Sequence, residues 1–129
     1  MNGSPRASFE ISLPWPLPCL FPNAKRRSHW RTYVKPAKKY REDCMWMTRA
    51  VIGRTIFTTP PKVAIAFYPP DLIRRDPDNL VGAAKHAIDG VADAIGHDDS
   101  TWKPTFTFHE PRRPHGAVVV TLTVEERQA

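Results

Sequence analysis

The sequence predicts an α/β (α+β) fold, a small mixed β-sheet with two main helices in the order β-α-β-α-β-β. Three observations lead to this prediction. Four short segments have the alternation or apolar composition of strands, two longer segments repeat apolar residues at helical spacing, and prolines gather between them. The 129 residues suffice for one domain, residues 1–129, although a partner subunit would add to a core of this size.

The first half of the chain contributes one strand and one helix. Ser8–Leu13 alternates apolar and polar residues and is followed by a proline-rich segment, which cannot continue a sheet ladder. Asn23–Pro36 is rich in Arg and Lys and is predicted to be a loop. Ala37–Ile56 is predicted to be an amphipathic helix. Its expected buried stripe contains Tyr40, Cys44, Met47, Val51 and Ile52.

The second half contributes three strands and the second helix. Lys62–Tyr68 carries large apolar residues on one face and alanines on the other, so both faces are expected to be covered. Pro77–Ile95 is predicted to be a helix, capped by Asp76 or Asp78 and closed by Gly96. Trp102–His109 and Ala117–Val124 alternate again and are predicted to form a hairpin. The expected buried stripe of the helix is Leu80, Ala84, Ala87, Ile88, Val91 and Ile95.

Charge is distributed unevenly along this basic chain, whose formal net charge is +6. Residues 23–49 hold nine basic and two acidic residues, whereas residues 71–99 hold seven acidic and three basic residues. Basic residues interleaved with aromatic ones suit phosphates and exposed bases, so we predict DNA binding; the alternative is two solvated faces. The predicted DNA-binding residues are Lys25, Arg26, Arg27, His29, Trp30, Arg31, Lys35, Lys38, Lys39, Arg74 and Arg75.

Four aspartates flank the second predicted helix, Asp76 and Asp78 at its start and Asp98 and Asp99 past its end. Mg²⁺ prefers oxygen ligands, usually one or two carboxylates with water and substrate phosphates. We therefore predict that these carboxylates bind Mg²⁺, with Mn²⁺ as a substitute, for phosphodiester hydrolysis. Lys85 shares a helical face with Asp78 and would neutralise charge on the scissile phosphate. Alternatively, the first two aspartates only cap the helix, and the others belong to surface pairs and a loop.

The length of this helix separates the two acidic pairs. About 20 helical residues span roughly 30 Å, too far for both pairs to share one ion within a monomer. Three arrangements would reunite them. The helix is shorter or broken near Gly90, the second pair folds back, or the second pair comes from another chain.

Other function classes find no support in the sequence. Motifs for serine hydrolases, phosphate-binding loops, dinucleotide binding and zinc proteases are missing. There is no apolar run of 18 residues and no apolar leader at the N-terminus, so we expect no membrane span and a cytoplasmic location.

Three segments of this chain resemble the RusA family of Holliday-junction resolvases, enzymes of DNA recombination and repair common in phages and prophages. They are LPWP at Leu13–Pro16, RRDPDNL at Arg74–Leu80, and the pair Asp98-Asp99 after a helix and a glycine. The order of elements is similar as well, so the resemblance covers most of the chain.

The resemblance implies a homodimeric, Mg²⁺-dependent endonuclease that cuts four-way DNA junctions by paired, symmetric nicks. It assigns metal binding to Asp76, Asp78 and Asp99, with Asp98 a further candidate. The family also has a catalytic lysine shortly after DNL. Here the equivalent position is Gly82, and we expect Lys85, one turn later, to substitute for it.

Two other functions remain open. One is a broader endonuclease of flap or branched DNA, which the displaced lysine would favour. The other is a basic DNA-binding protein without catalytic activity, which would gain nothing from acidic residues near phosphates.

Overall fold

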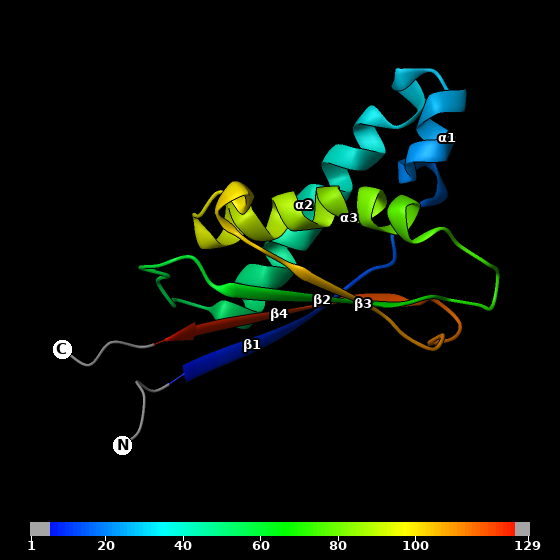
Figure 1. Ribbon diagram of the computed structural model, residues 1–129. Coiled ribbons are helices and arrows are strands. Elements are labelled where there is room, and N and C mark those ends of the chain that lie inside the picture. Colours follow the sequence, from blue (N-terminus) through cyan, green and yellow to red (C-terminus); the bar gives the residue numbers. More distant parts are fainter. Residues whose placement is uncertain (1–5, 126–129) are drawn as a thin grey trace.

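The computed structural model describes residues 6–125 as a four-stranded mixed sheet with helices on one face (Figure 1), which confirms the predicted fold class. The main elements follow the predicted order β-α-β-α-β-β. The elements are β1 (Arg6–Leu13), η1 (Pro18–Leu20), α1 (Pro22–Arg27), η2 (Trp30–Thr32), α2 (Val34–Ile52), β2 (Lys62–Tyr68), α3 (Pro77–Ile95), η3 (Asp99–Thr101), β3 (Thr105–Phe108) and β4 (Ala117–Glu125).

The strand order is β1-β4-β2-β3, which shows that the predicted hairpin of the last two strands is wrong. β4 pairs antiparallel with both β1 and β2, whereas β3 pairs in parallel with β2 on its other side. The reason is the crossover through α3, which returns the chain to the sheet in the direction of β2. The proline-rich segment after β3 then carries the chain past β2 to the centre of the sheet.

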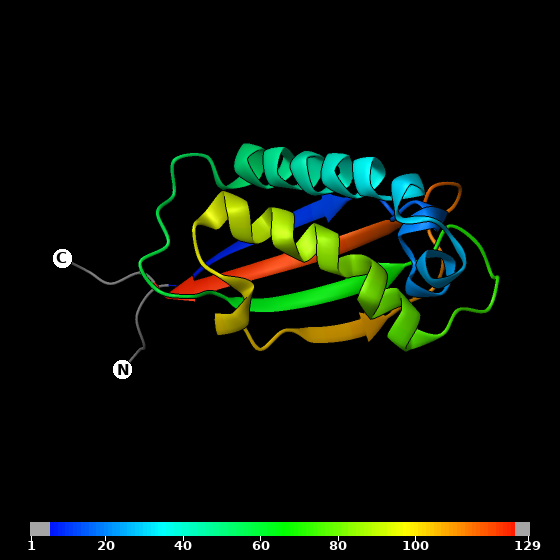
Figure 2. The ribbon, with the colours of Figure 1, turned by 90° about the horizontal axis from the view of Figure 1, so that it is seen from above.

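Both long helices lie across the same face of the sheet (Figure 2). Val63, Ile65 and Phe67 of β2 point to this face and are buried. Ala64 is exposed and Ala66 half-buried on the other face. The prediction that both faces of β2 are covered is therefore wrong for the described residues.

The α2 helix is shifted toward the N-terminus relative to its prediction. Tyr40 and Cys44 are buried as expected, but Met47 and Val51 are 38% and 44% exposed. Ile52 is buried as predicted, and Thr48, which was not predicted, completes the stripe because these residues continue the spacing of four. The hydroxyl group of Thr48 donates to the carbonyl oxygen of Cys44 at 2.7 Å, which satisfies this buried polar group.

The α3 helix has the predicted bounds and is unbroken at Gly90. Here the two long helices cross, since a Cβ atom on Gly90 would lie 2.3 Å from the carbonyl oxygen of Arg41 and 2.9 Å from Cβ of Cys44. This glycine therefore permits close packing of α2 against α3. Asp76 is the N-cap, and its carboxylate accepts a hydrogen bond from the backbone N–H of Asp78 at 3.3 Å.

The predicted basic loop at residues 23–36 is largely helical, because α1, η2 and the first turn of α2 fall within it. The α1 helix packs against the N-terminal half of α3, where a Cβ atom on Gly82 would lie 2.5 Å from Cγ of Pro22. Within residues 6–125, no helix combines the length and hydropathy needed to cross a membrane.

Candidate functional site

The predicted acidic residues lie at opposite ends of α3. This helix has 19 residues, so its ends are about 28 Å apart. Asp76 and Asp78 lie at its start. Asp98 and Asp99 fold back only to the level of Lys85, whose ammonium group is 3.7 Å from the Asp99 carboxylate. One chain therefore does not bring the two pairs together, and across residues 6–125 no three His, Cys, Asp or Glu side chains form a metal-binding group.

The N-terminal pair is exposed and lies beside α1. The side-chain oxygen of Asn79, next to Asp78, accepts a hydrogen bond from the backbone N–H of Asn23 at 3.1 Å. This bond attaches the start of α1 to the first turn of α3. The acidic pair is thereby held next to the basic segment of the chain.

The C-terminal pair lines an open cavity of about 470 Å³. Arg41 from α2 binds Asp93 through two hydrogen bonds, at 2.7 and 2.9 Å, and lies 4.0 Å from Asp89. Lys85 lies between Asp89 and Asp99, at 3.8 and 3.7 Å. Four carboxylates, of Asp89, Asp93, Asp98 and Asp99, thus line the cavity together with Arg41, and Lys85 pairs with two of them. Arg41, Asp89 and Asp93 were not predicted as site residues, since pairing between two helices leaves no pattern in the sequence.

The two carboxyl groups of the C-terminal pair differ in pKa. A hydrogen bond from the backbone N–H of Ser100, at 2.9 Å, and the Asp99 carboxyl group lower the pKa of Asp98. Burial and the neighbouring Asp98 carboxyl group raise the pKa of Asp99, against the influence of Lys85. A bound cation would favour the charged form of both groups.

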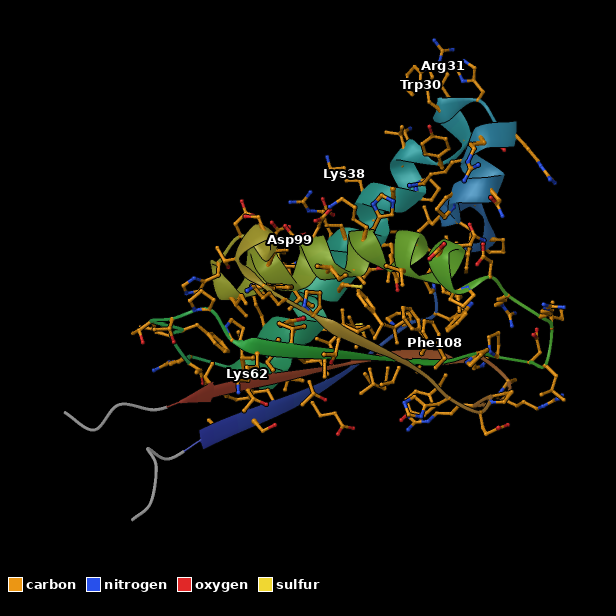
Figure 3. All side chains as sticks on the ribbon, viewed as in Figure 1. Trp30, Arg31, Lys38, Lys62, Asp99 and Phe108 are labelled. Carbon is orange, nitrogen blue, oxygen red and sulfur yellow. The ribbon has the colours of Figure 1, made fainter. Side chains whose placement is uncertain are left out.

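The predicted DNA-binding residues lie mostly on α1, η2 and the first half of α2, which rise away from the sheet (Figures 1 and 3). We call this region the basic arm, residues 22–41. Its described side chains include no Asp or Glu, and most of its cations are exposed. The exposed basic residues of the arm are Arg26, Arg27, Arg31, Lys35, Lys38, Lys39 and Arg41, of which Lys39 pairs with Asp43 and Arg41 with Asp93.

Two residues of the predicted DNA-binding set are engaged in the fold instead. Arg75 pairs with Asp71 at 2.8 Å, donates to the carbonyl oxygen of Ile73 and lies over the ring of Trp15. Lys25 donates to Nε2 of His86 at 2.6 Å. The Arg75 side chain thus stabilises the loop before α3, and the Lys25 side chain connects α1 to α3. Arg74, in the same set, is exposed.

The contact between Lys25 and His86 predicts a pH dependence of stability. Burial, and then Lys25, lower the pKa of His86 from its ordinary value of 6.5; Lys85 and Arg41 act in the same direction, and Asp89 opposes them. The unfolded chain therefore binds more protons at this residue than the native protein does. The contribution of neutral His86 to stability is present above pH 6.5 and is lost as the pH falls through the lowered pKa.

Urea unfolding from pH 7.5 to 5 tests this prediction. We expect the native protein to lose stability on acidification more steeply than His86→Gln, which can still accept from Lys25 but cannot be protonated. Equal slopes for the two proteins would contradict it.

Lys85 and Gly82 differ in what surrounds them. Lys85 is mostly exposed and contacts the C-terminal pair rather than Asp78. Gly82 faces Pro22 so closely that a side chain there would displace α1. A lysine at this position would require α1 to move.

A protein similar to this chain is found among known proteins. No family model matches the chain. A protein of Xylella fastidiosa (strain Temecula1 / ATCC 700964), described only as an uncharacterized protein, is 35% identical over 123 residues. The match covers 92% of this chain and 78% of that protein.

Proposed function

This chain belongs to the same family as the uncharacterized Xylella protein, and we propose that it is a Mg²⁺-dependent endonuclease that resolves four-way DNA junctions by paired, symmetric nicks. One observation carries the proposal: an unbroken α3 has an acidic pair at each end and a basic arm fixed to its first turns. The RRDPDNL and DD segments, which resemble the RusA resolvases, supply these acidic pairs.

The charges favour an enzyme over a DNA-binding protein without activity. The basic arm suits a phosphate backbone, and its cations are largely unpaired with acidic residues in the described part of the chain. Asp76 and Asp78 lie beside this arm, where they would repel phosphates in the absence of a cation. A cation bound between carboxylates and phosphate removes that repulsion.

The donors at the start of α3 fit Mg²⁺. Its protein sites usually combine one or two carboxylates with water and substrate phosphates, and Asp76 and Asp78 supply two exposed carboxylates. When bound, Mg²⁺ would activate water and stabilise the leaving oxygen. The capping bond of Asp76 fixes the orientation of its carboxylate.

A homodimer would complete the site. If two copies align their α3 helices antiparallel about a two-fold axis, Asp76 and Asp78 of one copy face Asp98 and Asp99 of the other. Lys85, held near Asp99, would then approach the scissile phosphate from the partner's side and neutralise its charge. Two such sites match the two equivalent strands of a four-way junction.

Incubation with a labelled four-way junction and a linear duplex of the same sequence tests the proposal. We expect symmetric nicks in the junction, no cleavage of the duplex, complete loss with EDTA and recovery with Mg²⁺ or Mn²⁺. Junction binding without cleavage in any divalent metal would contradict the proposal and indicate a binding protein.

A second candidate, an endonuclease of flaps and other branched DNA, is favoured by Gly82. The resolvases that this chain resembles have a lysine after DNL, and the packing of Pro22 leaves no room for one here. Flap and three-way substrates in the same assay distinguish the candidates, since a junction resolvase cleaves them more slowly than the four-way junction.

A further inference from the structure

Trp30 is a large aromatic side chain at the outer end of the basic arm. It begins η2, is 53% exposed and lies with Arg31 farthest from the sheet in Figure 3. A tryptophan in this position contributes little to the core. Its exposure on a strongly cationic segment therefore calls for a partner.

The surroundings of Trp30 hold it in a defined position. The His29 ring is 5.4 Å from its ring, between centroids, and the Arg31 guanidinium group lies 5.4 Å from its centroid. Nδ1 of His29 accepts from the backbone N–H of Arg31 at 3.2 Å, and the Thr32 hydroxyl group donates to the His29 carbonyl oxygen at 2.7 Å. These bonds fix the single turn that presents the indole ring.

The basic arm is itself attached to α3, where the N-terminal acidic pair lies. Asn23 bonds to Asn79, Lys25 bonds to His86, and Pro22 packs against Gly82. Three contacts therefore connect the arm that carries Trp30 to the first half of α3. A DNA strand held at the acidic pair would lie next to this arm.

Trp46 shows that exposure alone does not distinguish Trp30. It is 61% exposed and has an Arg49 guanidinium group 5.1 Å from its ring centroid. However, it follows Glu42 and Asp43 on α2, whereas the basic arm holds no acidic residue. Trp46 thus supplies a comparison of equal chemistry in less cationic surroundings.

We propose that Trp30 stacks against an unstacked base at the branch point of branched DNA while the exposed arginines of the basic arm hold the adjacent phosphates. This inference rests on the proposed function for its substrate. Intact duplex presents base faces only at its ends, so stacking adds affinity for a branch point and not for a duplex interior. Trp30 then contributes to the selection of branched DNA, and the arginines contribute affinity for any DNA.

Binding measured in EDTA separates this inference from catalysis. Fluorescence anisotropy with a labelled four-way junction and a covalently closed duplex compares the native protein with Trp30→Ala, Trp30→Phe and Trp46→Ala. We expect Trp30→Ala to weaken junction binding by about 10- to 100-fold, with duplex binding changed less than about two-fold. Trp30→Phe should retain most of the affinity and Trp46→Ala should resemble the native protein.

A 2-aminopurine base at the branch point supplies a second measurement. We expect the native protein to change its fluorescence and Trp30→Ala to bind, at saturating concentration, without that change. The inference would be overturned if Trp30→Ala lost junction and duplex binding equally. It would also be overturned if Trp30→Ala changed the 2-aminopurine fluorescence as much as the native protein does. Native protein that binds and gives the signal but never cuts with Mg²⁺ would refute the proposed function alone.

Discussion

Asp78→Asn is expected to reduce the rate of junction cleavage by more than about 100-fold in saturating Mg²⁺. Loss of a residue that supports a metal ligand already costs 10- to 100-fold, and the change at Asp78 removes a carboxylate expected to bind the metal directly. Asparagine retains the size of the side chain, and the N-cap of the helix, Asp76, is left unchanged. Single-turnover cleavage of a labelled junction measures the rate.

The matched control is Asp43→Asn, the same chemical change on α2, where Asp43 pairs with Lys39 at 2.8 Å. It should cleave at nearly the native rate. In EDTA, Asp78→Asn should bind junctions at least as tightly as the native protein, since one repulsive charge is gone. Cleavage by Asp78→Asn at the native rate would exclude Asp78 from the site.

Gly90→Ala should destabilise the protein by about 2 kcal/mol or more. In an exposed helix this change would stabilise by up to about 1 kcal/mol. Here the new Cβ atom would lie 2.3 Å from the carbonyl oxygen of Arg41, a backbone atom that moves only if α2 moves. Urea unfolding followed by circular dichroism measures the change in the free energy of unfolding.

Ala50→Gly is the control for Gly90→Ala. Ala50 is exposed on α2, so its loss should cost only the intrinsic difference in helix propensity, about 1 kcal/mol. If Gly90→Ala proved more stable than the native protein, the two helices would not cross at this glycine.

Local signals in the sequence were sufficient to predict several elements of the fold. The bounds of α3 follow from Asp76 and Pro77 at its start and Gly96 at its end, where the backbone adopts φ 76°. The strand Lys62–Tyr68 follows from its composition and from the prolines on both sides. These are interactions between near neighbours in the chain, so the sequence carries them directly.

The arrangement of these elements could not be predicted in the same way. The insertion of β4 between β1 and β2 depends on pairing between distant segments. The buried stripe of α2 contains Thr48 in place of Met47, because one hydrogen bond to Cys44 makes the hydroxyl group compatible with the core. The short α1 depends on its contacts with α3, which no local pattern in a basic segment indicates.

The candidate site, too, could be predicted from the sequence only in part. The sequence indicates the type and order of its carboxylates, and the length of the helix already separates Asp78 from Asp99. The structure removes one explanation, a break at Gly90, and limits how far Asp98 and Asp99 fold back. The remaining arrangement, in which two chains share each site, is a proposal about an assembly and not about one chain.

Mixing two inactive variants tests this arrangement most directly. Asp78→Asn and Asp99→Asn are each expected to be inactive, because each removes a carboxylate from both sites of the dimer. In a mixed dimer, one shared site carries both substitutions and the other carries neither. We expect dimers reassembled from the mixture to regain nicking of one strand of the junction. If each site belonged to a single chain, every site would keep one defect and the mixture would remain inactive.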